Sequence, residues 1–183
     1  GMPFIGSAAE GQTLDRILHY FEVKDDVVLD PLDPDGYEVV CLGGRRYRFA
    51  NGRRAFIDTL AADFPRERES LERYFDLIER VAGASSLHSL KYAETDAAVN
   101  TEYQLRSIND VVDEMISDPL LAKVLVGNLP LYAAERDKTP FSTLAFIMDF
   151  YNQSAYRIVG GSDRLTQSLV QTIERHRGRV VTR

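Results

Sequence analysis

The residue types that most often carry catalysis or bind metals are sparse and scattered in this sequence. Its three histidines, His19, His88 and His176, share no motif, and each is more typical of a structural or surface position than of a metal ligand or a base. Its single cysteine, Cys41, falls inside an expected strand and is interpreted as a small hydrophobic residue. The sequence contains no phosphate-binding loop, nucleophile elbow or zinc-protease motif, so it assigns no catalytic residue.

A double glycine, Gly160-Gly161, gives the most distinctive spacing in the chain. Glycine adopts positive φ easily and lets a ligand or another backbone approach closely. We expect a strand over 156–159, a helix capped by Ser162 or Asp163, and a second strand over 179–183. An ordinary strand-helix-strand unit is the simplest interpretation, and a ligand-facing turn is the alternative.

The composition is that of one domain with a real hydrophobic core. The chain has 183 residues, 44% of them hydrophobic, and a formal net charge of −6. A negative balance is unfavourable for nucleic-acid binding, which needs clustered Lys and Arg, so no nucleic-acid partner is expected. No apolar run reaches the roughly 20 residues of a membrane span, and a lone cysteine fits a reducing compartment. We therefore expect a cytoplasmic protein and leave open a peripheral association with a membrane.

Turn and capping residues divide the chain into its expected elements. A loop entering at Pro3-Phe4-Ile5 is expected within residues 1–12, and Thr13 is expected to cap a helix ending near residue 23. Residues 27–49 are expected to be β, with an apolar run over 27–29 and with Gly43-Gly44 joining two hairpin strands over 37–42 and 45–49. Helices are expected over 53–64, 65–83, 107–116, 118–125 and 141–151, with a less decisive short helix and loop in 87–106. The fold class is therefore α+β, a small antiparallel or mixed sheet capped by a helical block.

Three of these helices have explicit start signals. Ser107 and Asp110 have the spacing of a capping box, and Asp118-Pro119 and Thr139-Pro140 each place a cap before a proline at the first helical position. The helix after Thr139-Pro140 is apolar around most of its circumference, so it is either buried on several sides or lines an apolar cavity. The charged residues over 66–80 alternate in sign, which is typical of a solvated face with i, i+4 ion pairs.

Several segments together resemble one family. Tyr156, Gly160-Gly161 and Leu165, followed by a helix and Gly178-Arg179-Val180-Val181, resemble a motif of the phytoene desaturase, carotenoid isomerase and retinol saturase group of FAD-dependent oxidoreductases. The order of the segments Gly1 to Gly6, Pro31 to Pro34, Phe64 to Glu67 and Asp118 to Leu121 is also similar. Val159 departs from the pattern, because the family has a proline just before the double glycine.

The resemblance implies that residues 1–183 form a single substrate-binding domain, like that of FAD-dependent amine-oxidase and phytoene-desaturase-like enzymes. The flavin-binding Rossmann domain is expected outside this stretch, so FAD is the cofactor of the longer protein and none is expected on this chain alone. Residues near the flavin would be Pro3, Phe4, Gly160 and Gly161. An apolar, polyene-like substrate would lie against four aromatic residues: Phe146, Phe150, Tyr151 and Tyr156. Desaturation, saturation and isomerisation all remain open.

The expected partners follow from the same resemblance. They are an apolar small molecule, the missing flavin domain and, because a cut domain exposes apolar surface, a second copy of the chain. The competing interpretation is a stand-alone helical module that binds lipid or another protein and has no catalytic activity. Plain core packing remains the simplest role for the apolar helix over 141–151.

Overall fold

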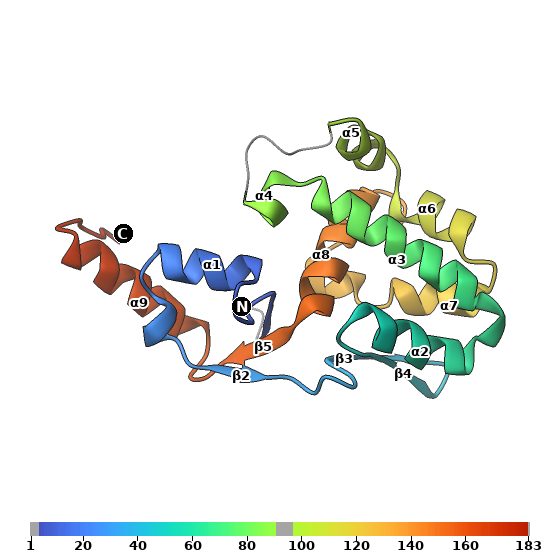
Figure 1. Cartoon of the computed structure of the whole chain (residues 1–183), viewed down its shortest axis with the longest axis horizontal. Helices are drawn as coiled ribbons and strands as arrows, with labels where there is room; N and C mark the ends of the chain where they lie inside the picture. The colour runs from blue at the N-terminus through green and yellow to red at the C-terminus, as the bar shows by residue number, and fades with distance from the viewer. Residues whose placement is uncertain (1–3, 91–96, 183) are drawn as a thin grey trace.

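The computed structural model describes residues 4–90 and 97–182, arranged as a larger helical part and a smaller part around a short sheet. In Figure 1 the smaller part lies at the left and the helical part at the right, with one long helix joining them. The architecture is α+β, with small antiparallel sheets and many helices.

The smaller part is built on three antiparallel strands. Strand β5 (Ala155–Ile158) lies in the middle, between β1 (Phe4–Gly6) and β2 (Leu29–Pro31). The expected loop over 3–5 is therefore wrong for Phe4 and Ile5, because β5, far along the chain, provides a strand with which they pair. Around this sheet lie α1 (Thr13–Tyr20), the 3₁₀ turn η1 (Lys24–Asp26) and α9 (Ser162–Arg175).

The second sheet is the expected hairpin. Strands β3 (Glu38–Leu42) and β4 (Arg45–Phe49) pair in register across Gly43 and Gly44, whose φ values are +60° and +78°. Both central residues of such a tight hairpin turn need positive φ, which explains the two glycines. Cys41 lies inside β3, as expected, and its side chain is exposed.

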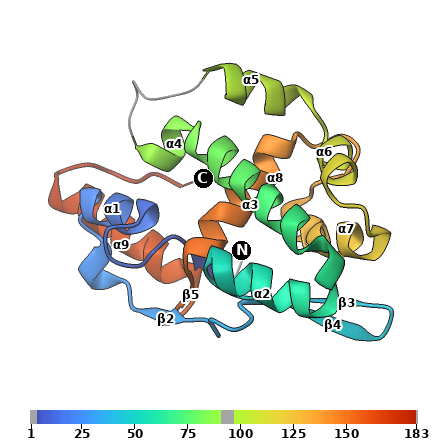
Figure 2. The same ribbon diagram turned by 45° about the vertical axis from the view of Figure 1, so that its right-hand side comes forward.

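The helical part surrounds α8 (Phe141–Gln153), which contacts α3, α5, α6 and β1. Its aliphatic and aromatic side chains form the core, in which Tyr74, Phe75 and Phe141 are 0–1% exposed. Figure 2 shows α8 crossing behind α3. The other elements are α2 (Arg53–Asp63), η2 (Pro65–Glu67), α3 (Arg68–Gly83), α4 (Ser86–Ser89), α5 (Ala97–Leu105), α6 (Ile108–Met115), α7 (Pro119–Leu125) and η3 (Leu129–Tyr132).

Two of the expected caps are confirmed. Ser107 accepts a hydrogen bond from the Asp110 amide at 3.1 Å, and the Asp110 carboxylate accepts one from the Ser107 amide. Asp118 accepts hydrogen bonds from the Leu120 and Leu121 amides at 2.8 and 3.2 Å. Each cap satisfies amide groups that have no partner within the helix.

Other expected helix starts are wrong. Thr13 is the first residue of α1 and bonds to the His88 carbonyl instead, and α1 ends at Tyr20. Pro140, not Thr139, is the N-cap of α8, because the Thr139 hydroxyl accepts a hydrogen bond from the Glu135 amide. Gly161 is the N-cap of α9, so Ser162 and Asp163 lie inside that helix.

The strand expected over 179–183 is also wrong for its described residues, 179–182, which have no regular secondary structure. Both edges of β5 are already taken by β1 and β2, and the chain after α9 leaves Val181 78% exposed. Within residues 4–90 and 97–182, no helix combines the length and apolar character needed to cross a bilayer.

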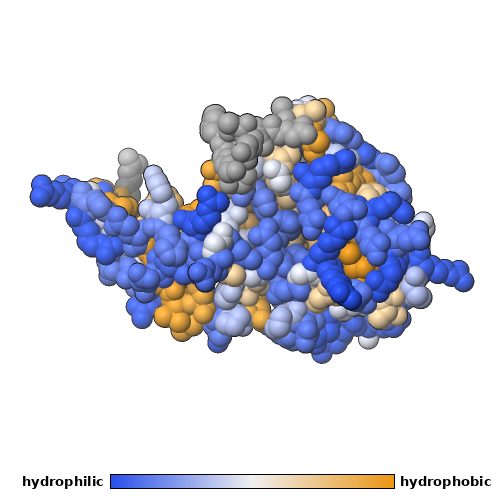
Figure 3. All heavy atoms as spheres, in the orientation of Figure 1, coloured by the Kyte–Doolittle hydropathy of each residue, from blue (hydrophilic) through white to orange (hydrophobic). Residues whose placement is uncertain are grey.

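The surface seen in Figure 3 is mainly hydrophilic, with a hydrophobic patch under the smaller part. Exposed apolar side chains of that part include Tyr20, Phe21, Val28 and Val159, with exposed fractions of 82, 48, 65 and 47%. Several apolar side chains of the smaller part are therefore exposed.

Candidate ligand-binding site

Four aromatic side chains form a continuous row, here called the aromatic row, between α8 and β1. Phe146 and Phe150, one helical turn apart on α8, stack with ring centroids 5.4 Å apart, and Tyr151 meets Phe150 edge-on at 6.1 Å. Phe4 of β1 extends the row, with its centroid 5.2 Å from that of Tyr151. All four residues are only partly buried, so the row is not simply core.

Gly6 allows β1 to lie close enough to α8 to complete the aromatic row. A Cβ atom at Gly6 would lie 2.6 Å from the Phe150 carbonyl oxygen and 2.7 Å from a ring carbon of Phe150. Ser7, next along the chain, donates a hydrogen bond to that same carbonyl at 2.9 Å, and Tyr151 donates one to the Phe4 carbonyl at 3.4 Å. These bonds fix the strand against the helix.

A histidine and a carboxylate lie at one end of the aromatic row. His88 Nε2 is 3.0 Å from Asp149 Oδ2, and the His88 ring meets Phe146 edge-on at 6.1 Å. Gln153 donates a hydrogen bond to the same Asp149 oxygen at 2.6 Å. Burial raises the pKa of the Asp149 carboxyl, and His88 and Gln153 oppose that rise.

The other imidazole nitrogen of this pair is available for a ligand. His88 Nδ1 is buried, and no described residue forms a hydrogen bond with it. A buried polar atom without a partner is costly, so such an atom often belongs to a binding or catalytic site. When the Nε2–H of a neutral imidazole donates to Asp149, Nδ1 is left as a hydrogen-bond acceptor.

A second polar group lies at the opposite end, beside Tyr151. The Tyr132 ring centroid is 6.2 Å from that of Tyr151, and the Asn128 amide donates a hydrogen bond to Glu38 Oε2 at 3.0 Å. Burial raises the pKa of the Tyr132 and Tyr37 phenols and of the Glu38 carboxyl. The Tyr37 hydroxyl is buried and finds no hydrogen-bond partner among the described residues.

The arrangement is therefore an apolar wall with polar atoms at both ends. The phenols stay neutral at pH 7, so they can donate a hydrogen bond to a hydroxyl or carbonyl group. A site of this kind suits an elongated apolar molecule that carries one polar end group.

The structure brings together some of the residues singled out in the sequence and separates others. Phe4, Phe146, Phe150 and Tyr151 come together in the aromatic row. Tyr156 lies elsewhere, on β5, where it lines a separate cavity of about 520 Å³ with Pro31, Leu32 and Ser154 among others. None of the ring contacts found in the described parts of the chain joins Tyr156 to the row.

Of the residues expected near a flavin, Phe4 pairs with Arg157 on β5, three residues before Gly160. Gly160 and Gly161 form an exposed turn, each with φ of +84°, and a Cβ atom at Gly161 would meet nothing within 4 Å. Pro3 lies outside the described residues. The expected position of these residues beside a flavin stays a prediction. The described residues also contain no group of side chains that could hold a metal ion.

Sequence reasoning missed the His88–Asp149 pair. His88 follows a break between helices and shares no motif, so nothing near it in the sequence marks it. Asp149 did carry a signal, because it is a carboxylate between Met148 and Phe150 in a strongly apolar helix, where it needs a partner.

Comparison with known protein sequences finds similarity to one group of enzymes. The chain is 28% identical over 155 residues to an all-trans-retinol 13,14-reductase from Rattus norvegicus, an alignment that covers 77% of this chain and 26% of the relative. The Danio rerio and Homo sapiens proteins of the same name are 26% and 23% identical over 201 residues, covering 100% of this chain and 33% of each relative.

The chain is thus a distant homologue of these reductases and spans a quarter to a third of their length. No family model matches the chain, and no solved structure matches it significantly.

Proposed function

We propose that this chain is the substrate-binding part of an FAD-dependent oxidoreductase that acts on an elongated apolar molecule of the polyene class. The aromatic row is the observation that carries this proposal. The relatives support it, because their name specifies all-trans-retinol, a polyene with one terminal hydroxyl group.

This proposal assigns redox chemistry and substrate binding to different parts of the longer protein. FAD, bound by a flavin-binding part outside residues 1–183, would supply the redox chemistry. This chain would bind and orient the substrate: Phe146, Phe150 and Tyr151 would contact the polyene. Tyr132 would donate a hydrogen bond to its polar end, or His88 Nδ1 would accept one from it. An apolar wall also excludes water from the substrate.

The binding step can be tested directly, because the chain contains nine tyrosines and no tryptophan. Tyrosine emission overlaps the absorption of all-trans-retinol, so quenching of tyrosine fluorescence during a retinol titration reports binding. The double variant Phe146→Ala/Phe150→Ala removes two rings of the aromatic row, and we expect its Kd to rise at least about tenfold, since buried aromatic contacts are worth more than 1 kcal/mol.

Phe21→Ala is the matched control, because Phe21 is 48% exposed and lies outside the aromatic row. Its Kd should equal that of the unmodified chain. Equal retinol affinity in the double variant, with circular dichroism showing that it is folded, would overturn the proposed binding site. A fatty acid that binds as tightly as retinol would favour a lipid-binding module instead.

A separate experiment tests the proposal that the flavin is bound outside this chain. Titration of FAD against this chain, followed by flavin fluorescence, should show no tight complex, because the turn at Gly160 and Gly161 is open. Sub-micromolar FAD binding would contradict the proposal that the flavin is held elsewhere.

A further inference from the structure

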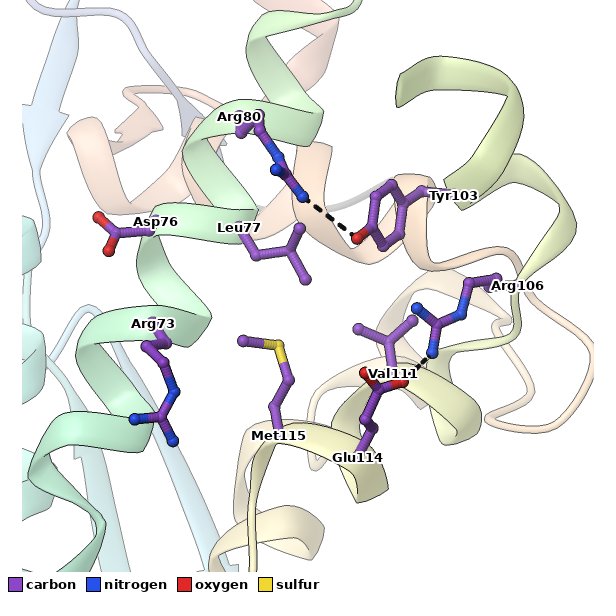
Figure 4. A pocket seen from close by; sticks show the side chains of 9 residues that line it. All are labelled: Arg73, Asp76, Leu77, Arg80, Tyr103, Arg106, Val111, Glu114 and Met115. Carbon is purple, nitrogen blue, oxygen red and sulfur yellow. Dashed lines mark hydrogen bonds and ion pairs between the residues drawn. The ribbon is translucent and has the colours of Figure 1, made fainter. Parts of the chain in front are cut away.

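A pocket far from the aromatic row is lined by three arginines. It lies between α3, α5 and α6 and has a volume of about 320 Å³. Figure 4 shows Leu77 and Met115 pointing toward each other across it, with guanidinium groups around them. The arginines are Arg73, Arg80 and Arg106. We call this the arginine pocket; its walls are apolar and its rim is cationic.

Tyr103 positions two of these arginines. Tyr103 is only 5% exposed, and its hydroxyl accepts a hydrogen bond from Arg80 at 3.2 Å. The guanidinium carbons of Arg80 and Arg106 lie 5.9 and 5.8 Å from its ring centroid. Such cation–π contacts keep both guanidinium groups beside the pocket and leave N–H donors free.

The acidic residues of the arginine pocket are already neutralised. Glu114 pairs with Arg106, and Asp76 pairs at 2.6 Å with Arg53, which lies outside the pocket. Arg73 donates a hydrogen bond to the Ser70 hydroxyl at 3.2 Å. Among the residues described, no carboxylate forms an ion pair with Arg73 or Arg80, so two positive charges remain uncompensated in a chain whose net charge is −6.

The charged side chains of α3 are exposed, as expected for a solvated face, but its ion pairs do not follow the expected i, i+4 pattern. The ion pairs of that helix run to α2, as in Arg53–Glu79 and Arg68–Asp58, and not between residues four apart within α3. These ion pairs engage the acidic side chains that lie between α3 and α2. Arg73 and Arg80 lie on the pocket side of α3.

We propose that the arginine pocket binds a small amphiphilic oxyanion, a phosphate monoester or carboxylate carried on a short alkyl group. Arg73 and Arg80 would bind the oxyanion by charge-assisted hydrogen bonds, for which the planar guanidinium is well suited. Leu77, Val111 and Met115 would contact the alkyl group. The ligand could be a free metabolite or the head group of a phospholipid, which share this chemistry.

The test is calorimetric titration of the whole chain with hexyl phosphate, 1-hexanol and inorganic phosphate. Hexyl phosphate should bind most tightly, since it alone uses both the arginines and the apolar wall. The double variant Arg73→Gln/Arg80→Gln should bind it at least about tenfold more weakly, because it loses charge-assisted hydrogen bonds to the oxyanion.

Arg46→Gln/Arg54→Gln is the matched control, with the same loss of charge at exposed positions outside the pocket. It should keep the affinity of the unmodified chain. An equal loss in both double variants would show only non-specific attraction, and tight binding of 1-hexanol would show an apolar site; either result overturns the proposal. Binding to vesicles containing phosphatidic acid that depends on Arg73 and Arg80 would support it and identify the source as a lipid.

Discussion

The contact between β1 and α8 makes the sharpest prediction about this fold. Substituting Gly6→Ala would place a methyl group 2.6 Å from the carbonyl oxygen and 2.9 Å from the carbonyl carbon of Phe150. These are backbone atoms of a central helix, so β1 must move instead. Forcing extra atoms into a packed contact costs about 1 to 3 kcal/mol, or roughly 2 to 12 °C in Tm for a chain of this size.

Gly83→Ala adds the same methyl group where the structure has room for it. Gly83 is the last residue of α3, and a Cβ atom there would meet nothing within 4 Å. Alanine loses less backbone entropy than glycine on folding, so this variant should be more stable by about 0.5 to 1 kcal/mol.

The assay is urea unfolding of both variants beside the unmodified chain, followed by circular dichroism. The midpoints should shift in opposite directions, downward for Gly6→Ala and upward for Gly83→Ala. The strand should also carry Phe4 away from Tyr151, so retinol affinity should fall in Gly6→Ala alone. A Gly6→Ala variant as stable as Gly83→Ala would refute the close approach of β1 to α8.

Two further predictions concern single polar side chains. Ser107→Ala removes the capping box of α6 and should destabilise the chain by about 0.5 to 2 kcal/mol in urea unfolding, whereas Ser107→Thr should retain most of the stability. Burial raises the pKa of the Glu38 carboxyl above its ordinary value of 4.5, because the folded state disfavours the ionised form. The protonated carboxyl is therefore compatible with folding below pH 4.5, and the free energy of unfolding falls as the pH rises through the folded-state pKa. Glu38→Gln should therefore be more stable than the unmodified chain at pH 7 but not at pH 4, and a pH-independent difference would contradict this.

The expected elements that were confirmed depend on chemistry within a few residues. The hairpin at Gly43-Gly44 requires two adjacent positive φ values, and the caps at Ser107 and Asp118 bond to amides two or three residues away. Such interactions are complete within a short segment, so the sequence alone predicts them.

The elements that were wrong depend on partners far along the chain. Phe4 and Ile5 form a strand only because β5 lies beside them, and residues 179–182 form none because they pair with none of the described strands. Thr139 is not a cap because its hydroxyl is already bonded to the Glu135 amide. Local propensity cannot reveal which groups compete for the same partner.

The same distinction between local and long-range interactions applies to the candidate site. The sequence by itself determined that residues 141–151 form an apolar helix with Phe146 and Phe150 one turn apart, because helical periodicity places them on one face. Only the tertiary structure decided that Phe4 joins them while Tyr156 does not, that His88 meets Asp149, and that Arg106, just after α5, lines one pocket with two arginines of α3. Each of these contacts joins segments remote in sequence, and packing of the whole core, not the spacing of residues, brings such segments together.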